Sequence, residues 1–142
     1  MAKPYEMTTA KRVVSSLMAV AARMGLGNFA VLTTTGHKSG TRRAVTVAPI
    51  REGDVEYLVS PYGDSAWVRN ARAHPEASLR RGREERRVRL VEVTGHKAAL
   101  VKRYHEREAF ARQFMDVPGD ATEADFAAVP ERFPIFRVDH SG

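Results

Sequence analysis

Apolar residues first repeat with the period of a helix, over residues 8–24. Its valines, leucine and methionines share one broad stripe, and Lys11, Arg12 and Arg23 lie outside that stripe. This pattern predicts an amphipathic helix that ends at one of the glycines just after residue 24. Such a helix usually packs on a core, and basic flanks beside an apolar face are also typical of helices at an anionic membrane surface. Both interpretations stay open at this stage.

Beyond residue 28 the apolar positions alternate as in β-strands, with helical stretches between them. The first three strands are expected to form a meander, because only short turns separate them. The next two are expected to form a hairpin around Gly82. The expected strands cover residues 29–35, 43–51, 56–60, 77–81, 86–94 and 133–138.

Helical patterns occupy the remaining stretches, and Pro75 ends the first of them because proline biases its predecessor out of the helical region. The sequence predicts one α+β domain over residues 1–142, with a helix in 1–27 and the remainder in 28–142. The antiparallel sheet, of about six strands, is expected to close into a small barrel. The expected helices cover residues 65–73, 97–115 and 122–128.

Composition removes several classes of function. The chain has no cysteine, and its five histidines are scattered without a ligand spacing, so neither disulfides nor a metal site are expected. Neither a stretch of about 20 apolar residues nor a secretory signal pattern occurs, which predicts a cytoplasmic protein, with membrane contact through the N-terminal helix as an alternative. The net charge of +6 favours anionic partners.

The densest basic run covers residues 80–87, where Glu84 and Glu85 interrupt the arginines. It lacks the aromatic residues on which single-stranded nucleic acid stacks, so a nucleic-acid partner is not expected. We interpret the run as a solvated hairpin. A module that binds a nucleic acid or a lipid surface through the arginines of 80–89 is the alternative.

A second basic segment has a sharper chemical pattern. Residues 33–43 place two glycines, several hydroxyl groups and three cationic side chains, those of Lys38, Arg42 and Arg43, directly after an apolar strand. Glycines let backbone N–H groups approach an oxyanion, and the side chains add charge-assisted hydrogen bonds. The segment therefore predicts an anion-binding loop for a phosphorylated cofactor. An ordinary exposed hairpin turn has a similar composition and remains the alternative.

Several motifs together resemble the deazaflavin-dependent nitroreductase family, the F420-binding split β-barrel oxidoreductases. They are the T-T-x-G-x-K-S-G-x-x-R pattern ending at Arg43, the turn at 51–54, a strand ending in Ser60, and W-x-x-N-x-x-x-H-P from Trp67 to Pro75. The resemblance implies a split β-barrel and F420 as cofactor, with FMN as the alternative. It also implies hydride transfer from reduced deazaflavin to a quinone, a nitroaromatic or a similar activated acceptor, and a homodimer.

The same resemblance implies the positions of the site. Lys38 and Arg43 are expected to hold the cofactor phosphate, and Ser60 lies beside the deazaflavin ring, where its hydroxyl is a candidate catalytic group. Trp67 either borders the ring or belongs to the core. The implied cofactor-binding residues are Gly36, His37, Lys38, Ser39, Gly40, Arg43, Thr46, Val47, Ala48, Ser60, Trp67 and Asn70.

Aromatic residues of the 97–115 helix are candidate contacts for an apolar acceptor that lies flat on the ring. These residues are Tyr104, Phe110 and Phe114, with Met115 beside them, and a core stripe explains the same spacing. His37 stands where the family commonly has arginine, and Pro61 where it often has a basic residue. These two departures support an alternative function, a non-catalytic protein that carries the cofactor, a fatty acid or another amphiphile in the same barrel.

Overall fold

The computed structural model of the chain describes most of the barrel. The predicted N-terminal helix lies outside the described residues except for Val20, and so do Phe110 and Phe114. The described residues are 20, 28–93, 97–108, 112, 115, 117, 119–129 and 132–140.

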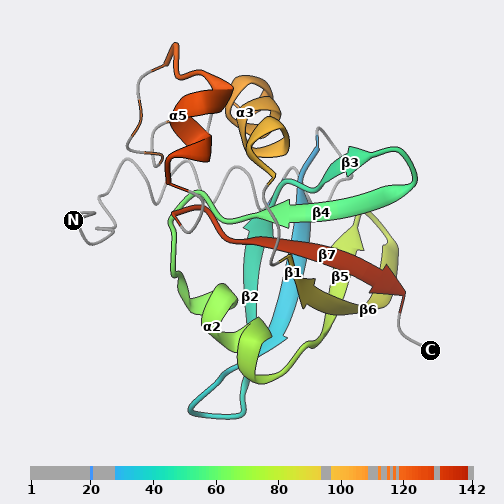
Figure 1. The fold of residues 1–142 in the computed structure, drawn as a ribbon. Coiled ribbons are helices and arrows are strands. Elements are labelled where there is room, and N and C mark those ends of the chain that lie inside the picture. Colours follow the sequence, from blue (N-terminus) through green and yellow to red (C-terminus); the bar gives the residue numbers. More distant parts are fainter. Residues whose placement is uncertain are drawn as a thin grey trace.

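Seven antiparallel strands form one curled sheet in the order β2-β1-β5-β6-β7-β4-β3 (Figure 1). Three helices accompany it within the described residues, which agrees with the predicted α+β class, and the curl gives a half-barrel. The strands are β1 (Ala30–Thr35), β2 (Arg42–Val47), β3 (Ile50–Glu52), β4 (Val55–Val59), β5 (Glu76–Arg81), β6 (Glu84–Glu92) and β7 (Ile135–His140), and the helices are α2 (Ala66–Ala73), α3 (Ala98–Arg107) and α5 (Glu123–Ala127).

The predicted meander of the first three strands is wrong. The predicted strand at 43–51 is two strands, because Pro49, which has no N–H to donate to a ladder, breaks it between β2 and β3. β2 then pairs with β1 at one edge of the sheet, while β3 pairs with β4 at the other. The predicted hairpin around Gly82 is confirmed as β5 and β6.

The predicted helix at 97–115 is also too long. Helix α3 ends at Arg107, and the backbone leaves the helical region at Glu108. The carboxyl of Glu108 is only 5% exposed and accepts a hydrogen bond from Asn28 Nδ2 at 3.3 Å. The turn at Glu108 therefore gives its buried carboxyl a hydrogen-bond partner. The helical pattern of the sequence continues past this residue and does not indicate the turn.

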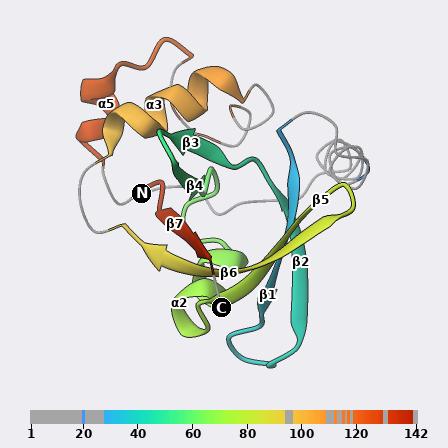
Figure 2. The ribbon, with the colours of Figure 1, turned by 90° about the vertical axis from the view of Figure 1, so that its right-hand side faces the viewer.

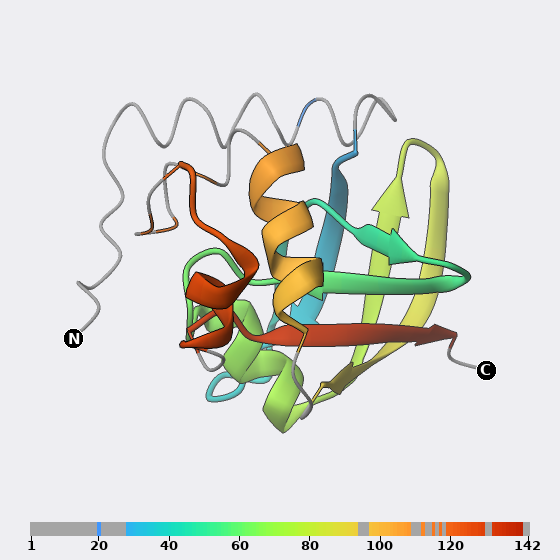
Figure 3. The same ribbon diagram turned by 45° about the horizontal axis from the view of Figure 1, so that its top comes forward.

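The curled sheet has two cores, one on each face. Helix α2 packs inside the curl, where Trp67, Val68 and Ala71 meet Leu32 of β1 and Phe136 of β7. Helices α3 and α5 cover the outer face of β3, β4 and β7 (Figures 2 and 3). Strands β4 and β7 are therefore buried on both faces, and α2 stands beside the turn that joins β1 to β2 (Figure 1).

Candidate cofactor-binding site

The predicted anion-binding loop is the hairpin connection between β1 and β2. Gly36 donates from its backbone N–H to Thr41 O at 2.7 Å, and Gly40 donates to Gly36 O at 2.9 Å. A Cβ at Gly36 would lie 2.5 Å from Ser39 Oγ, and Gly40 has a φ of 70°. The positive φ favours glycine at Gly40, and a Cβ at Gly36 would displace Ser39 Oγ and crowd Thr41 O at 3.1 Å, in a loop that folds back on itself. The loop is thus both a hairpin turn and a concave stretch of backbone.

Asn70 of α2 ties this loop to the barrel. Its Oδ1 accepts from the backbone N–H of His37 at 2.9 Å and lies 2.8 Å from His37 Nδ1, while its Nδ2 donates to Thr34 Oγ1 at 3.2 Å. A backbone N–H can only donate, so the amide oxygen must face His37, and Nδ1 of the ring must carry a proton. Asn70 and Thr34 are 3% and 2% exposed, so these bonds are shielded from water.

Strand register decides which cations accompany the loop. Arg43 stands opposite Thr34 in the β1–β2 ladder, so its side chain leaves the sheet on the face where Asn70 lies. Arg42 points to the other face, where its guanidinium donates to Ser78 Oγ at 3.4 Å. Lys38 is exposed at the loop itself. Arg43 thus lies on the α2 side of the loop and Arg42 does not, while Lys38 belongs to the exposed loop itself.

Two donors of the loop stay available for a ligand. In the part of the chain that the structure describes, the backbone N–H groups of Lys38 and Ser39 have no hydrogen-bond partner, and the Lys38 ammonium forms no ion pair. Ser39 Oγ is bonded to Thr41 Oγ1. Backbone N–H groups beside two cations are the donor set that a phosphate diester prefers. The residues present therefore fit the anionic part of a phosphorylated cofactor.

Ser60 lies in the interior at the end of β4. Its side chain is 0% exposed, its hydroxyl donates to Gly63 O at 2.7 Å, and its backbone N–H donates to Pro134 O at 2.9 Å. Gly63 has a φ of 73°, and the bond from Ser60 closes the turn that leads into α2. The structure thus gives the Ser60 hydroxyl a positioning contact, and a proton-donor role would require that this contact break.

Trp67 belongs to the inner core. It is 4% exposed, and its ring centroid lies 5.4 Å from that of Phe136. The implied ring-binding stretch of β2 behaves similarly, because the side chains of Val47 and Ala48 are buried in the two cores at 7% and 2% exposure. Thr46 is half-buried. A planar ring would therefore meet the backbone of this stretch.

The implied substrate contacts that the structure describes are core residues. Tyr104 is 1% exposed, and burial raises its pKa far above the ordinary value, so it stays protonated at neutral pH. Met115 is 3% exposed in the same outer core. His105 is 1% exposed with its ring centroid 5.4 Å from that of Phe126, and burial, followed by the charge of Arg112, lowers its pKa.

Sequence reasoning missed the part played by Thr34. Its hydroxyl, on the inward face of β1, is the buried partner of Asn70. The alternation of Leu32 and Thr34 on one face was a usable signal, because a threonine in line with core residues needs a hydrogen-bond partner. Among the described residues no group of three or more metal-ligating side chains occurs, and none of the described helices is long and apolar enough to cross a membrane.

Comparison with known proteins gives a consistent result. A model of the F420H2-dependent quinone reductase family matches residues 6–116. The chain is similar to a solved structure of an F420H2-dependent reductase, FDR-A, with 21% identity over 79% of this chain and 94% of that one, and a TM-score of 0.51. No curated protein matches the chain.

Other solved structures share the fold at lower identity. The heme storage protein HutZ from Vibrio cholerae has 9% identity over 93% of this chain and 90% of its own, with a TM-score of 0.57. A further structure, a domain-swapped dimer, has 21% identity over 93% of this chain and 100% of its own, with a TM-score of 0.53.

The family match spans the segment that carries the loop, Ser60, Trp67 and Asn70. It confirms the prediction that the cofactor is F420 and not FMN. It also confirms the prediction that the protein is an oxidoreductase and not a non-catalytic carrier. The chain therefore belongs to the F420H2-dependent quinone reductase family, whose members are oxidoreductases that use F420 as cofactor.

Proposed function

We propose that this protein binds F420 with the loop at 36–43 and uses the reduced cofactor to reduce a quinone. One observation carries the proposal: a glycine-shaped loop, tied to α2 through Asn70, presents unpaired backbone N–H groups beside Lys38 and Arg43. Charge-assisted bonds from such a set match the phosphate diester of the cofactor. When bound, reduced F420 supplies the hydride.

The protein's own residues position the reaction. Lys38 and Arg43 bind the phosphate, and Asn70 keeps the loop in the binding conformation through both of its bonds to His37. The backbone at 46–48 forms the surface on which the ring lies, and its buried side chains hold that surface in place. A fixed ring can present one reactive carbon to the acceptor without reorganisation.

The proton that the reduced quinone needs comes from solvent in this proposal. The Ser60 hydroxyl already donates to Gly63 O, and Tyr104 is covered, while burial raises its pKa and makes it a weaker proton donor. His105 is also covered. No rate contribution from general-acid catalysis by these three groups is therefore expected.

Binding of F420 to wild-type protein and to Lys38→Ala and Arg43→Ala tests the loop, with cofactor fluorescence as the readout. Each cation is expected to contribute a charge-assisted bond, so each substitution weakens binding by about tenfold or more. Arg42→Ala is the matched control, because it removes the same charge one residue away on the other face of the sheet. Equal weakening in all three variants would show only a general charge effect and refute the assignment.

Turnover tests the acceptor. Oxidation of F420H2 is followed with menadione, with a nitroaromatic of similar size, and without acceptor. The quinone is expected to give the highest kcat/KM, and Lys38→Ala is expected to raise the KM for F420H2. Oxidation of F420H2 that no quinone accelerates would overturn quinone reduction while leaving cofactor binding standing.

We also propose a homodimer. The similar structure that forms a domain-swapped dimer supports it, and β2 and β3 offer two sheet edges for pairing. Light scattering during gel filtration is expected to give twice the chain mass, and a monomer at micromolar concentration would contradict it.

A further inference from the structure

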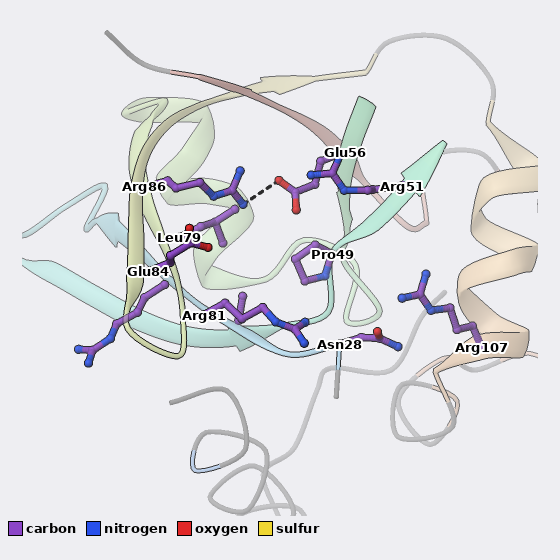
Figure 4. Close-up of a pocket in the computed structure, with 11 residues that line it drawn as sticks. Asn28, Pro49, Arg51, Glu56, Leu79, Arg81, Glu84, Arg86 and Arg107 are labelled. Atoms are coloured by element: carbon purple, nitrogen blue, oxygen red, sulfur yellow. Dashed lines mark hydrogen bonds and ion pairs between the residues drawn. The ribbon is translucent and has the colours of Figure 1, made fainter. Parts of the chain in front are cut away.

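A cavity of about 410 Å³ opens at the opposite end of β1 from the cofactor loop (Figure 4). Residues before β1 line it, whereas the loop follows the last residue of that strand. Arg107 reaches into it from α3, and Arg86 and Glu56 point toward each other across it (Figure 4). The lining residues are Asn28, Ala30, Pro49, Arg51, Glu56, Leu79, Arg80, Arg81, Glu84, Arg86 and Arg107.

Strand register places these charges on the inside of the barrel. In the β5–β6 hairpin Leu79 stands opposite Arg86, and Arg81 stands opposite Glu84, so all four share one face. Leu79 belongs to the inner core, which identifies that face as the concave one. Side chains that fill a small barrel are normally apolar. The inward arginines therefore lie at an open end of the barrel. Helix α2 fills the opposite end.

Strands β3 and β4 form the wall opposite the β5–β6 hairpin, and they also carry charged residues on the face toward the cavity. Arg51 stands opposite Glu56 in the β3–β4 ladder, and Glu56 forms an ion pair with Arg86 at 3.0 Å. The Glu56 side chain, only 12% exposed, thus pairs with Arg86 and stands across the ladder from Arg51. The Arg51 guanidinium forms no ion pair with any carboxylate among the described residues. Glu56 can satisfy one arginine, which leaves the other for a ligand.

The charge of the lining is unbalanced. Arg80 lies on the other face of β5, so four arginines, Arg51, Arg81, Arg86 and Arg107, stand against Glu56 and Glu84, an excess of two positive charges. The buried Glu108 lies behind Arg107, with 3.4 Å between its Oε1 and Arg107 Nε, and reduces the excess to one when ionised. The floor is apolar, formed by Ala30, Pro49 and Leu79. The cavity volume lies within the range of small-molecule sites, which often occur in the mouths of barrels.

We propose that this cavity, which we call the arginine mouth, is a second binding site that takes a small organic dianion, a dicarboxylate or a phosphate monoester. Guanidinium groups bind both kinds of group with two parallel hydrogen bonds. Arg51 of β3 and Arg107 of α3, which lie on the side of the cavity away from the β5–β6 hairpin, hold the two negative charges, and the apolar floor contacts the carbon skeleton. The site does not depend on the cofactor loop, from which the length of β1 separates it.

Isothermal titration calorimetry of the full chain at constant ionic strength tests the site. The probes are succinate and glycerol 3-phosphate, with acetate and glycerol as the monoanionic and neutral controls. Saturable one-site binding of at least one dianion, without binding of the controls, is expected, and the stronger probe identifies the preferred group. Absence of saturable binding by both dianions at millimolar concentration would overturn the proposal.

Variants locate the binding. Arg51→Gln and Arg107→Gln are each expected to weaken the dianion about tenfold. Arg83→Gln removes the same charge at the exposed tip of the hairpin, outside the cavity, and is expected to change binding by less than about twofold. Equal weakening in Arg83→Gln would reduce the effect to surface charge and refute the site.

A Lys38→Ala/Arg43→Ala double variant separates this proposal from the cofactor site. Dianion binding is expected to survive in it while F420 binding is lost. Loss of dianion binding in the double variant would place the probe in the cofactor loop and overturn the arginine mouth. Circular dichroism spectra and melting temperatures of all variants confirm that each is folded.

Discussion

Replacement of Asn70 by alanine is the sharpest test of how the loop is held. The substitution removes three hydrogen bonds, two to His37 and one to Thr34. The Thr34 hydroxyl, 2% exposed, would lose its amide partner inside the barrel, whereas the half-buried His37 can bond to water instead. The cost should therefore fall mainly on Thr34, with a smaller part on the loop.

The expected loss of stability follows from these bonds. Leaving the Thr34 hydroxyl unpaired costs about 1–2 kcal/mol, and exchanging the two His37 bonds for water costs about 0.5 kcal/mol each. Alanine returns about 0.5 kcal/mol through its higher helix propensity. The free energy of unfolding should fall by about 2 kcal/mol, which lowers the melting temperature of a domain of this size by about 6–8 °C.

Urea unfolding followed by circular dichroism measures this change, and fluorescence titration with F420 measures the second effect. A loop that is no longer anchored must be ordered when the cofactor binds, so F420 affinity should fall by about tenfold. Arg69→Ala on the exposed face of α2 is the control, because its contacts go to Asp64 at the surface. An unfolding free energy in Asn70→Ala within about 0.5 kcal/mol of wild type would refute the anchoring argument.

Three further predictions follow from other contacts. Gly40→Ala forces a φ of 70° on alanine, so urea unfolding should show a loss of about 1 kcal/mol, with weaker F420 binding; unchanged values would contradict the strain. Ser60→Ala should lower stability by about 1 kcal/mol, because Gly63 O loses the bond from Ser60 and keeps only the one from the Ser65 N–H, while steady-state kcat stays within about twofold; a large fall in kcat would indicate a catalytic hydroxyl. Burial lowers the pKa of His105 in the folded protein. When the pH is lowered below about 6.5, the ordinary pKa of histidine, the unfolded chain binds a proton before the folded protein does. Folding stability therefore decreases as the pH is lowered. Urea midpoints at about pH 7.5 and about pH 5.5 should differ less in His105→Gln than in wild type, and equal differences would refute this.

Local signals account for the elements that the sequence predicted well. A glycine turn at Gly82 and a proline at Pro75 mark where the chain must change direction, and the hairpin and α2 follow from them. Pro49 was the same kind of signal. The prediction of one continuous strand over 43–51 ignored it, and the predicted meander was therefore wrong. The pairing of β6 with β7 and of β7 with β4 joins segments far apart in the chain, which alternation alone cannot select.

The candidate site also combines features that depend on the local sequence with features that depend on the tertiary fold. The shape of the loop depends on neighbours within a few residues, so its glycines and cations were predictable. The contact of Asn70 with His37 and Thr34 depends on where α2 docks, which only the complete curled sheet determines. The burial of Ser60 and Trp67 has the same origin. The resemblance placed His37, Ser60, Trp67 and Asn70 near one site, and the fold decides which of them present polar atoms to it.

The arginines of the β5–β6 hairpin show how far alternation reaches. Arg86, Val88 and Leu90 share a face by spacing alone, and the last two are 0% and 3% exposed, so the sequence already placed Arg86 in line with a core. Alternation assigns a side chain to a face, but it does not say what stands across from that face. Here the opposite wall is Glu56 and its neighbour Arg51, brought in through β7 and β4. A solvated strand and one wall of a cavity therefore have the same local pattern, and the two differ only once the curled sheet brings distant strands together around the charges.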